Sequence, residues 1–456
     1  MPHVAHVVIR SSHMNILKWF SLVSLSAVSA ASAESSTMQS LNEVGTLPRV
    51  RCGTPKRKPW RMHFDPPQPE DEPRPGRQIP EQPPEMSADS SAPIEVSATV
   101  TAEEWNRFLK SVPDSHHLQT TIWAELKSLG GWEADRLVLR QAGRIIGGLQ
   151  LLHRQVSLLG RAGYVPRGPV FASADERLPK LLMSALKNLA ESKRVRYLMV
   201  QPPQCGADFV SELVAHGFTT TPFQTAPTAT VLIDLQQSVD ALRKNMRDSN
   251  RRSLRKAEAS GLRVRVGTAA DLPVFHALLS ATAQRHGFKP PSLAYLERMW
   301  CLFAATDDIV MFLVEQEGEP VAGEMDVTFG DTLVSKRAGW SGKHGKSHPN
   351  SFLVWAAMSW AHERGLKYYD MEGFDPELAR LVSSGAAVPD AGKQTHHWFK
   401  LGFGGKVVLL PDNYEVVRVP ILGAVHRTVW GHWLSLHFRQ WLVNRVLIPM
   451  TMRLRG

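Results

Sequence analysis

The chain has 456 residues, of which 43% are hydrophobic and 21% are charged, so it can form two or three globular domains and is too apolar to be disordered throughout. Its formal net charge of +10 favours a polyanionic partner, such as a nucleic acid, a phosphate-rich substrate or an anionic membrane. The cysteines Cys52, Cys205 and Cys301 are far apart, which excludes a disulfide framework and a CxxC metal site and indicates a reduced compartment.

Residues 1–95 are predicted to be a disordered N-terminal extension. Asn15 to Ala33 is an apolar run that contains one lysine and ends in Ala-Ser-Ala, which is typical of a signal peptide. The alternative is a misassigned start codon, with Met86 as a plausible true start. Residues 65–84 are rich in proline and charge, and they carry too little apolar surface to offset the entropy lost on ordering. We therefore expect a linker here.

The first folded domain is predicted over residues 96–236. Thr101 and Glu104 form a capping box that begins a helix. Two β-rich runs within residues 136–153 flank the turn Gln141-Ala-Gly-Arg144, which indicates a β-hairpin. The remaining predicted elements are helices over 120–129 and 178–191, a restricted loop over 163–170 and a strand over 195–201.

The second domain is predicted over residues 237–416 and repeats the same order of elements. Helices are expected over 270–285 and 351–364, a hairpin over 309–329, and strands over 331–339 and 366–371. The segment V-L-R-Q-A-G-R-I-I-G-G from Val138 resembles L-V-E-Q-E-G-E-P-V-A-G from Leu313, which suggests an internal repeat of one α/β unit. Chance similarity between two hairpins is the alternative.

A strongly basic segment lies near the start of the second domain. Leu242 to Gly261 is expected to form a helix that carries Arg247, Arg251, Arg252 and Arg255 among other basic residues. Like charges four residues apart on a helix destabilise it by a few tenths of a kcal/mol each. The segment therefore favours an anionic partner such as RNA, although an ordinary solvated helix face is the alternative.

Lys400 lies within T-H-H-W-F-K-L-G-F-G-G-K, residues 395–406, which we expect to be the end of an apolar strand. A lysine there is either an ordinary surface residue or a cation held near a reacting group. The glycines after Lys400 allow the backbone to approach a ligand closely.

Several of these stretches together resemble the FemAB family of peptidoglycan-bridge aminoacyltransferases. They are W-A-E-L-K at 123–127, Y-V-P-R-G-P-V at 164–170, R-R-S-L-R-K-A-E-A-S-G at 251–261, R-H-G-F at 285–288 and W-F-K-L-G-F-G-G at 398–405. The resemblance implies an α/β fold of two tandem GNAT-like domains with mixed sheets flanked by helices. It also implies transfer of an aminoacyl group from aminoacyl-tRNA to the stem peptide of a lipid-linked or UDP-linked peptidoglycan precursor.

The resemblance also assigns candidate site residues. Lys400 matches a lysine that stabilises the developing oxyanion or the phosphate at the tRNA end. Apart from the resemblance, Asp370 and Glu372 end a predicted strand and could accept a proton from the acceptor amine, and capping or salt-bridging carboxylates are the alternative. The substrate-binding candidates are Lys127, Lys289, Tyr295, Arg167 and Phe399, and the tRNA-binding candidates are Arg247, Arg251, Arg252 and Arg255. For Arg167, packing within a buried loop is the alternative. The chain departs from its relatives at Pro202-Pro203 and at Lys336-Arg337, which puts the usual precursor contacts in doubt.

Such an enzyme needs neither a metal nor a cofactor, because its ester donor is already activated. The main alternative is an N-acyltransferase that uses acetyl-CoA and acts in polysaccharide synthesis; a binding protein without activity is a third possibility. Residues 337–346 do not keep the glycine spacing of a CoA-binding loop. We expect the protein to be a monomer. We also expect it in the cytoplasm, because an exported enzyme could not meet aminoacyl-tRNA.

The C-terminal tail, residues 417–456, is predicted to be an amphipathic helix. From Val419 onward it contains Trp430, Trp433 and Trp441 together with five arginines, and it has no acidic residue. The helix would lie on an anionic membrane at its inner face, or alternatively dock onto the first domain.

Overall fold

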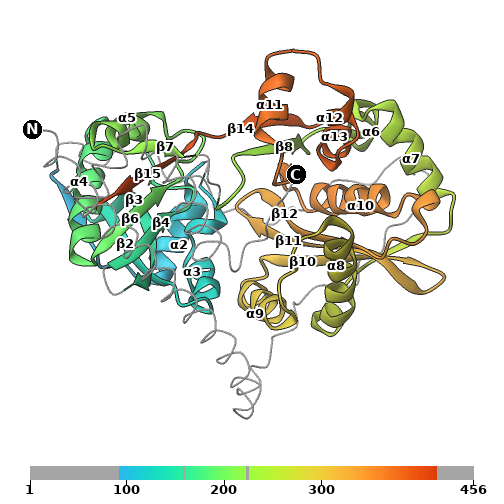
Figure 1. Ribbon diagram of the computed structural model, residues 1–456, viewed down its shortest axis with the longest axis horizontal. Helices are drawn as coiled ribbons and strands as arrows, with labels where there is room; N and C mark the ends of the chain where they lie inside the picture. The colour runs from blue at the N-terminus through green and yellow to red at the C-terminus, as the bar shows by residue number, and fades with distance from the viewer. Residues whose placement is uncertain (1–91, 114, 158–159, 222–224, 419–456) are drawn as a thin grey trace, which may run out of the picture.

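The computed structural model describes residues 92–113, 115–157, 160–221 and 225–418 (Figure 1). These residues form two lobes that lie side by side, each built around one mixed β-sheet. The signal-like segment, the proline-rich linker and residues 419–456 of the predicted tail lie outside the described residues.

The first sheet has eight strands. Seven of them follow the order β1-β2-β3-β4-β6-β15-β7, and β5 pairs with β3. The strands are β1 (Ile94–Ser97), β2 (Glu133–Gln141), β3 (Arg144–Ser157), β4 (Gly160–Val165), β5 (Val170–Phe171), β6 (Val195–Val200), β7 (Thr219–Thr221) and β15 (Asn413–Val417). Only the β4–β6 pair among them is parallel.

The second sheet has seven strands in the order β14-β8-β13-β12-β11-β10-β9. The strands are β8 (Ala229–Asp234), β9 (Arg263–Val266), β10 (Ile309–Gln316), β11 (Glu319–Phe329), β12 (Thr332–Trp340), β13 (Tyr368–Asp370) and β14 (Lys406–Leu409). Here only β12 and β13 pair in parallel.

The two sheets share one topology. Each begins with antiparallel strands, continues with one parallel pair and ends with two antiparallel strands. The hairpin turns correspond closely, because Ala142-Gly143 and Glu317-Gly318 all have positive φ and both hairpins have a register shift two residues before the strand ends. Positive φ at both central residues is typical of a type I′ hairpin turn. The predicted α/β fold with mixed sheets is confirmed.

Each sheet contains one strand that the predicted domain boundaries assign to the other domain. β8 precedes the expected boundary at residues 236/237 but lies inside the second sheet, between β14 and β13. β15 comes from the end of the described chain and lies inside the first sheet, between β6 and β7. The sheets therefore do not divide at residue 236, and Figure 1 shows β15 crossing into the lobe that carries the N-terminal strands.

Twelve α-helices and three short 3-10 helices cover the sheets in the described residues. The α-helices are α2 (Ala102–Ser111), α3 (Thr121–Ser128), α4 (Arg177–Ser192), α5 (Ala207–Ala215), α6 (Val239–Asn245), α7 (Asp248–Glu258), α8 (Leu272–His286), α9 (Leu293–Ala304), α10 (Pro349–Glu363), α11 (Pro376–Ser383), α12 (Asp390–Lys393) and α13 (His396–Leu401). The 3-10 helices are η1 (His117–Gln119), η2 (Ala269–Asp271) and η3 (Gly345–Ser347). The helices predicted over 120–129, 178–191, 270–285 and 351–364 are confirmed as α3, α4, α8 and α10.

One hydrophobic core joins the two lobes. Trp123 and Leu126 of α3 pack in the same cluster as Phe275 of α8 and Trp300 of α9. Burial of large apolar side chains stabilises such a contact by roughly 1.5–3 kcal/mol per residue. The contact between the two lobes is therefore stabilised by packed apolar side chains.

Three local predictions are corrected by the structure. The basic segment is two helices, α6 and α7, because Met246 and Arg247 have extended backbones. Residues 396–401 form the helix α13 and not a strand end. Part of the loop expected over 163–170 belongs to β4.

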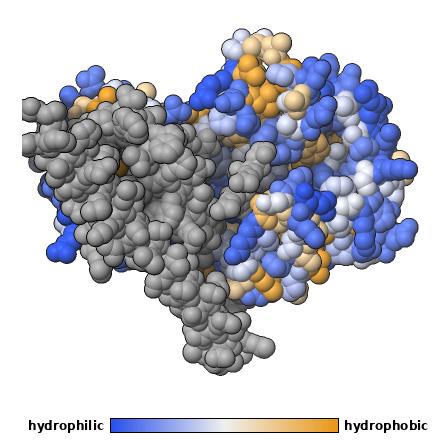
Figure 2. All heavy atoms as spheres, in the orientation of Figure 1, coloured by the Kyte–Doolittle hydropathy of each residue, from blue (hydrophilic) through white to orange (hydrophobic). Residues whose placement is uncertain are grey.

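Figure 2 shows a mostly hydrophilic surface on the described face of the second lobe. No helix among the described residues has both the length and the hydrophobicity needed to cross a membrane. Cys205 is exposed, whereas Cys301 is disulfide-bonded, which corrects the expectation of a chain without disulfides.

Candidate active site

Both lobes contribute to one polar cluster between the sheets. The positive charge of Arg167, in the first lobe, interacts with Asp370 and Glu372 in the second. The charge of Lys127 interacts with Lys336 and Arg337 across the same gap. We call this set the central cluster: Lys127, Arg167, Tyr295, Lys336, Arg337, Asp370, Glu372 and Lys400.

Lys400 of α13 holds the turn that follows β13. Its Nζ donates hydrogen bonds to the backbone oxygens of Met371 at 2.9 Å, Glu372 at 2.5 Å and Gly373 at 2.9 Å. Three successive carbonyls converge on one atom because Glu372 and Gly373 have positive φ values of 27° and 74°. Burial lowers the pKa of Lys400, and the carboxylates of Glu324, Glu372 and Asp370 oppose that shift. An ammonium has three protons, so the turn uses all of them.

The position of α13 is fixed by α7. Asn250 donates from Nδ2 to the Phe399 carbonyl at 3.1 Å, and the Arg247 amide donates to the Gly402 carbonyl at 2.9 Å. A Cβ on Gly402 would lie 2.2 Å from Oδ1 of Asn250, so the glycine is required for this approach. Gly402, two residues after Lys400 in the sequence, therefore contributes to the site by allowing α7 to approach α13.

Asp370 shapes the same turn and keeps one oxygen for another donor. Its Oδ1 accepts hydrogen bonds from the Thr230 hydroxyl and from the Glu372 amide, the latter at 2.8 Å. No described donor lies within hydrogen-bond distance of Oδ2. Burial raises the pKa of Asp370, which increases its affinity for a proton. The sequence-based choice of Asp370 as a proton acceptor is compatible with this geometry.

Glu372 forms a buried ion pair with Lys336. The Nζ of Lys336 lies 2.8 and 2.7 Å from the two carboxylate oxygens, and both side chains are less than a tenth exposed. Burial raises the pKa of Glu372, but the charges of Lys336, Arg337 and Arg167 outweigh it and lower the pKa. The Lys336-Arg337 pair, which looked in the sequence like a departure from relatives, is thus part of the central cluster.

Lys127 and Arg337 supply positive charge that no described carboxylate pairs with directly. Burial and the charges of Arg337 and Lys336 lower the pKa of Lys127 to about 7. The Nζ atoms of Lys127 and Lys336 lie 4.9 and 5.5 Å from the centre of the Trp123 ring. Cations crowded around one aromatic ring in this way favour an anionic ligand.

Arg167 lies deep in the loop between β4 and β5. It is 5% exposed, and it donates from Nη2 to the Pro227 carbonyl at 2.7 Å. Its Nε is buried and has no hydrogen-bond partner among the described residues. Arg167 therefore both packs the loop and keeps a donor available beside Asp370 and Glu372.

The other three predicted substrate-binding residues divide between the cluster and its surroundings. Tyr295 is 3% exposed, and its hydroxyl has no partner among the described residues. Burial raises the pKa of Tyr295, the charge of Arg337 opposes that shift, and the charge of Glu372 adds to it. Lys289 is exposed in the loop after α8, and no described contact joins it to the central cluster. Phe399 packs edge-on against Phe403, with ring centroids 5.1 Å apart, in the core of the second lobe.

A buried histidine pair beside the cluster was missed in the sequence. The rings of His116 and His117 lie 4.1 Å apart, and burial lowers both pKa values well below the usual range. Donor atoms of His116, His117 and Glu372 lie within 4.8 Å of one another, a spacing that suits a metal ion. Lys336 already binds both oxygens of Glu372, and the charge of Arg167 reaches both histidines. These surroundings favour an anion over a further cation.

Two buried carboxyl groups lie behind Lys400 on β11. Glu324 accepts hydrogen bonds from the Tyr369 hydroxyl at 2.9 Å and from the Ser335 hydroxyl. Asp326 is fully buried, and burial beside Glu324 raises its pKa well above the usual range. Burial also raises the pKa of Glu324, whereas the hydrogen bonds from Ser335 and Tyr369 and the charge of Lys400 oppose that shift.

The predicted tRNA-binding arginines fall into two groups. The guanidinium of Arg247 stacks over Trp398 at 3.8 Å, and Arg251 donates to the carbonyl oxygens of Lys244 and Met246 at 2.6 and 3.0 Å. These two arginines hold α6, α7 and α13 together. Arg252 and Arg255 are exposed on α7, and no described group pairs with either.

The comparison with known families agrees with the architecture. The FemAB family profile matches residues 100–316, which cover most of the first lobe and extend through β10 of the second. The lipid II:glycine glycyltransferase of Staphylococcus epidermidis (strain ATCC 35984) is 25% identical over 327 residues, or 69% of this chain and 78% of that protein. The lipid II:glycine glycyltransferase of Staphylococcus aureus (strain MRSA252) is 25% identical over 331 residues, with the same shares.

The fold is also similar to a solved structure. The crystal structure of FemX superposes with a TM-score of 0.63 at 20% sequence identity, covering 73% of this chain and 100% of FemX. The arrangement of two mixed sheets is therefore shared with a protein of known structure.

Proposed function

This chain belongs to the FemAB family, and we propose that it transfers an aminoacyl group from aminoacyl-tRNA to an amine on the stem peptide of a peptidoglycan precursor. Two relatives are lipid II:glycine glycyltransferases, which supports an acceptor of that class. The precursor is lipid-linked or UDP-linked, and in either form it carries phosphate groups.

The observation that carries the proposal is the unpaired positive charge of Lys127 and Arg337. Lys127 lies across the gap between the lobes from Arg337, and burial together with repulsion from Arg337 and Lys336 lowers the pKa of Lys127. A phosphate group between them would relieve that repulsion and would be held by charge-assisted hydrogen bonds. The departure from relatives at Lys336-Arg337 is therefore compatible with precursor binding.

Asp370 is the proposed proton acceptor. As the acceptor amine attacks the ester carbonyl carbon, a C–N bond forms and the nitrogen gains positive charge. The Oδ2 of Asp370 accepts the surplus proton, and its raised pKa suits that task. The C–O bond to the tRNA then breaks, and the same proton passes to the departing hydroxyl oxygen.

The developing oxyanion requires donors that are already in place. We propose the Tyr295 hydroxyl and the Nε of Arg167 for this role, because both are buried and lack partners among the described residues. Lys400 is proposed as a positioning residue, since its three protons hold the turn that carries Asp370 and Glu372. It would contact a substrate oxygen only by releasing one of these carbonyls.

The exposed pair Arg252 and Arg255 is proposed to contact the tRNA backbone. Exposed, unpaired arginines on one helix suit phosphate contacts, which carry affinity and depend on salt. The donor is a cytoplasmic molecule, so the proposal requires the protein to act in the cytoplasm or at the inner face of the membrane.

The test is transfer by the purified full chain, followed by mass spectrometry of the precursor. Aminoacyl-tRNA pools are offered with lipid II or with the UDP-linked precursor, and acetyl-CoA is offered as the competing donor. Lys127→Met is expected to raise KM for the precursor at least tenfold, whereas Lys180→Met on the exposed face of α4 serves as the matched control. Turnover of acetyl-CoA without any aminoacyl transfer would refute the proposal.

A further inference from the structure

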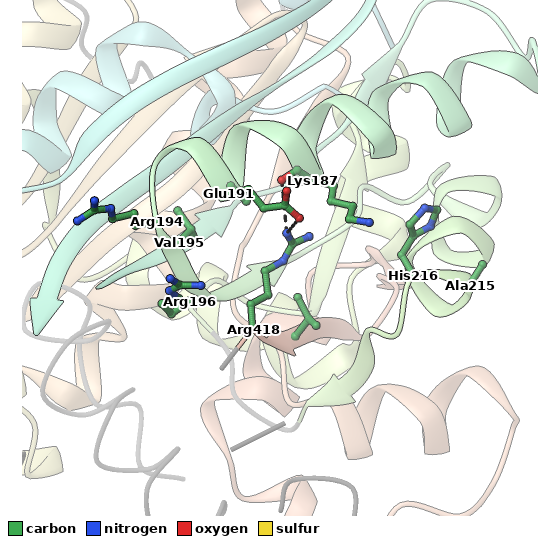
Figure 3. A pocket seen from close by; sticks show the side chains of 10 residues that line it. Lys187, Glu191, Arg194, Val195, Arg196, Ala215, His216 and Arg418 are labelled. Carbon is green, nitrogen blue, oxygen red and sulfur yellow. Dashed lines mark hydrogen bonds and ion pairs between the residues drawn. The ribbon is translucent and has the colours of Figure 1, made fainter. Parts of the chain in front are cut away.

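A second basic site lies far from the central cluster, on the outer side of the first lobe. A pocket of about 590 Å³ lies between the ends of α4 and α5 and the strands β6 and β15 (Figure 3). Its charged lining residues are Lys187, Glu191, Arg194, Arg196 and Arg418, with His216 at one side. The volume lies within the usual range of small-ligand pockets.

The pocket carries excess positive charge. Arg418 donates to the Glu191 carboxylate at 3.3 Å and to the Lys187 carbonyl at 3.4 Å, which uses the single acidic side chain of the lining. Lys187, Arg194 and Arg196 are exposed, and no described group pairs with their side chains. The helices α4 and α5 both end here, and each contributes roughly half a negative charge. An excess of about two positive charges remains after these are counted.

The fold builds this arrangement from three separate elements. Arg194 has a positive φ of 54° in the tight turn between α4 and β6, and Arg196 follows at the start of β6. The Arg418 amide donates to the Arg196 carbonyl at 2.7 Å, so the residue that follows β15 lies alongside Arg196. Figure 3 shows Arg418 extending toward Glu191, with Arg194 and Arg196 on one side of this pair and Lys187 and His216 on the other.

We infer that this pocket binds the phosphate of an anionic membrane lipid. The excess positive charge of the pocket favours an oxyanion such as a phosphate group, and two further observations favour a lipid as its source. The sequence that leaves the pocket, residues 419–456, has five arginines and no acidic residue. Val214, next to the lining residues Ala215 and His216, is 57% exposed, which suits an apolar contact at a bilayer surface.

The inference is independent of the proposed function, because it can be measured without any transfer reaction. The full chain is sedimented with phosphatidylcholine vesicles that contain or lack phosphatidylglycerol. The test variant is Lys187→Gln/Arg194→Gln/Arg196→Gln. The control is Arg144→Gln/Lys180→Gln/Lys406→Gln, which removes the same charge from exposed positions outside the pocket.

Each basic residue near an anionic surface contributes roughly a fivefold gain in partitioning, so the test variant should bind about a hundredfold more weakly. The control should lose about threefold or less. Equal losses in both variants would overturn the inference, because they would indicate general charge attraction. A thermal shift with inorganic phosphate that the test variant loses, together with unchanged vesicle binding, would also overturn it in favour of a soluble ligand.

A measurement on the unsubstituted chain covers the case in which the test variant does not fold. Hydrogen exchange of the amides over residues 187–196 and 414–418 should slow when vesicles with phosphatidylglycerol are added. Unchanged exchange there, with the chain bound to the vesicles, would refute binding at the pocket.

Discussion

Replacing Lys400 by methionine would test whether the turn after β13 depends on one ammonium group. The substitution keeps the length of the side chain and removes the donor to the carbonyls of Met371, Glu372 and Gly373. One hydrogen bond from a charged donor stabilises a protein by about 1.5–3 kcal/mol. The three bonds share one desolvated charge, and water can reach the half-buried turn, so we expect a net loss of about 3 kcal/mol.

Urea unfolding of Lys400→Met measures this loss, with the exposed Lys406→Met in β14 as the matched control. The transfer assay measures the second consequence. Because the turn carries Asp370 and Glu372, kcat should fall by about a hundredfold while KM for the precursor changes little. A free energy of unfolding within about 0.5 kcal/mol of the unsubstituted chain would refute the positioning role. A large fall in kcat with unchanged stability would instead favour direct contact between Lys400 and the reacting ester.

Three further predictions concern protonation and packing. Phosphate binding should raise the pKa of Lys127 from about 7, so precursor binding at slightly alkaline pH should take up a proton. Calorimetry in buffers of different ionisation enthalpy should detect this uptake, and Lys127→Met should abolish it. Burial raises the pKa of Asp326 well above its usual value of 3.8, so the unsubstituted protein loses stability as pH rises above 3.8, and Asp326→Asn should remove that loss. Urea unfolding at a series of pH values should show the difference growing toward neutral pH, and a constant difference would contradict it. A Cβ on Gly339 would lie 2.5 Å from the backbone nitrogen of Leu279, so Gly339→Ala should cost about 2 kcal/mol in thermal unfolding, whereas Gly345→Ala meets only ordinary contacts at 3.5 Å or more.

Much of the fold could be predicted from short local patterns in the sequence. The turns at Ala142-Gly143 and Glu317-Gly318 follow from polar-glycine pairs between β-rich runs, and both adopt the expected left-handed conformations. The helix that ends at Gly365 likewise follows from its sequence, since that glycine has a φ of 69°. These features depend on a few neighbouring residues, so one sequence is enough to predict them.

The candidate site was harder to predict because its geometry depends on residues that are distant in the chain. Lys400 was selected for its charge among apolar residues, but its partners at 371–373 depend on the left-handed backbone of Glu372. The pairing of Lys336 with Glu372 requires β12 and β13 to be adjacent and parallel, which no local pattern encodes. The helix over 396–401 was missed because aromatic residues favour strands in isolation, whereas the Thr395 cap and the contacts with α7 favour a helix.

The apparent surplus of charge on the basic segment has a similar explanation. Arg243 pairs with Glu258, fifteen residues later, once α6 and α7 fold against each other. Arg247 stacks on Trp398, which lies more than a hundred residues further along the chain. Sequence alone counts these charges as free because it does not show the partners that tertiary structure provides.

The position of β15 inside the first sheet has a consequence for how the protein is made. A ribosome releases the chain from its N-terminus, so β1 to β6 emerge long before residues 413–417. Until then β7 has no neighbour, because its only partner among the described strands is β15. Among the described strands β15 is the last to be synthesised, so β15 and β7 can join the first sheet only after every strand of the second sheet has been made.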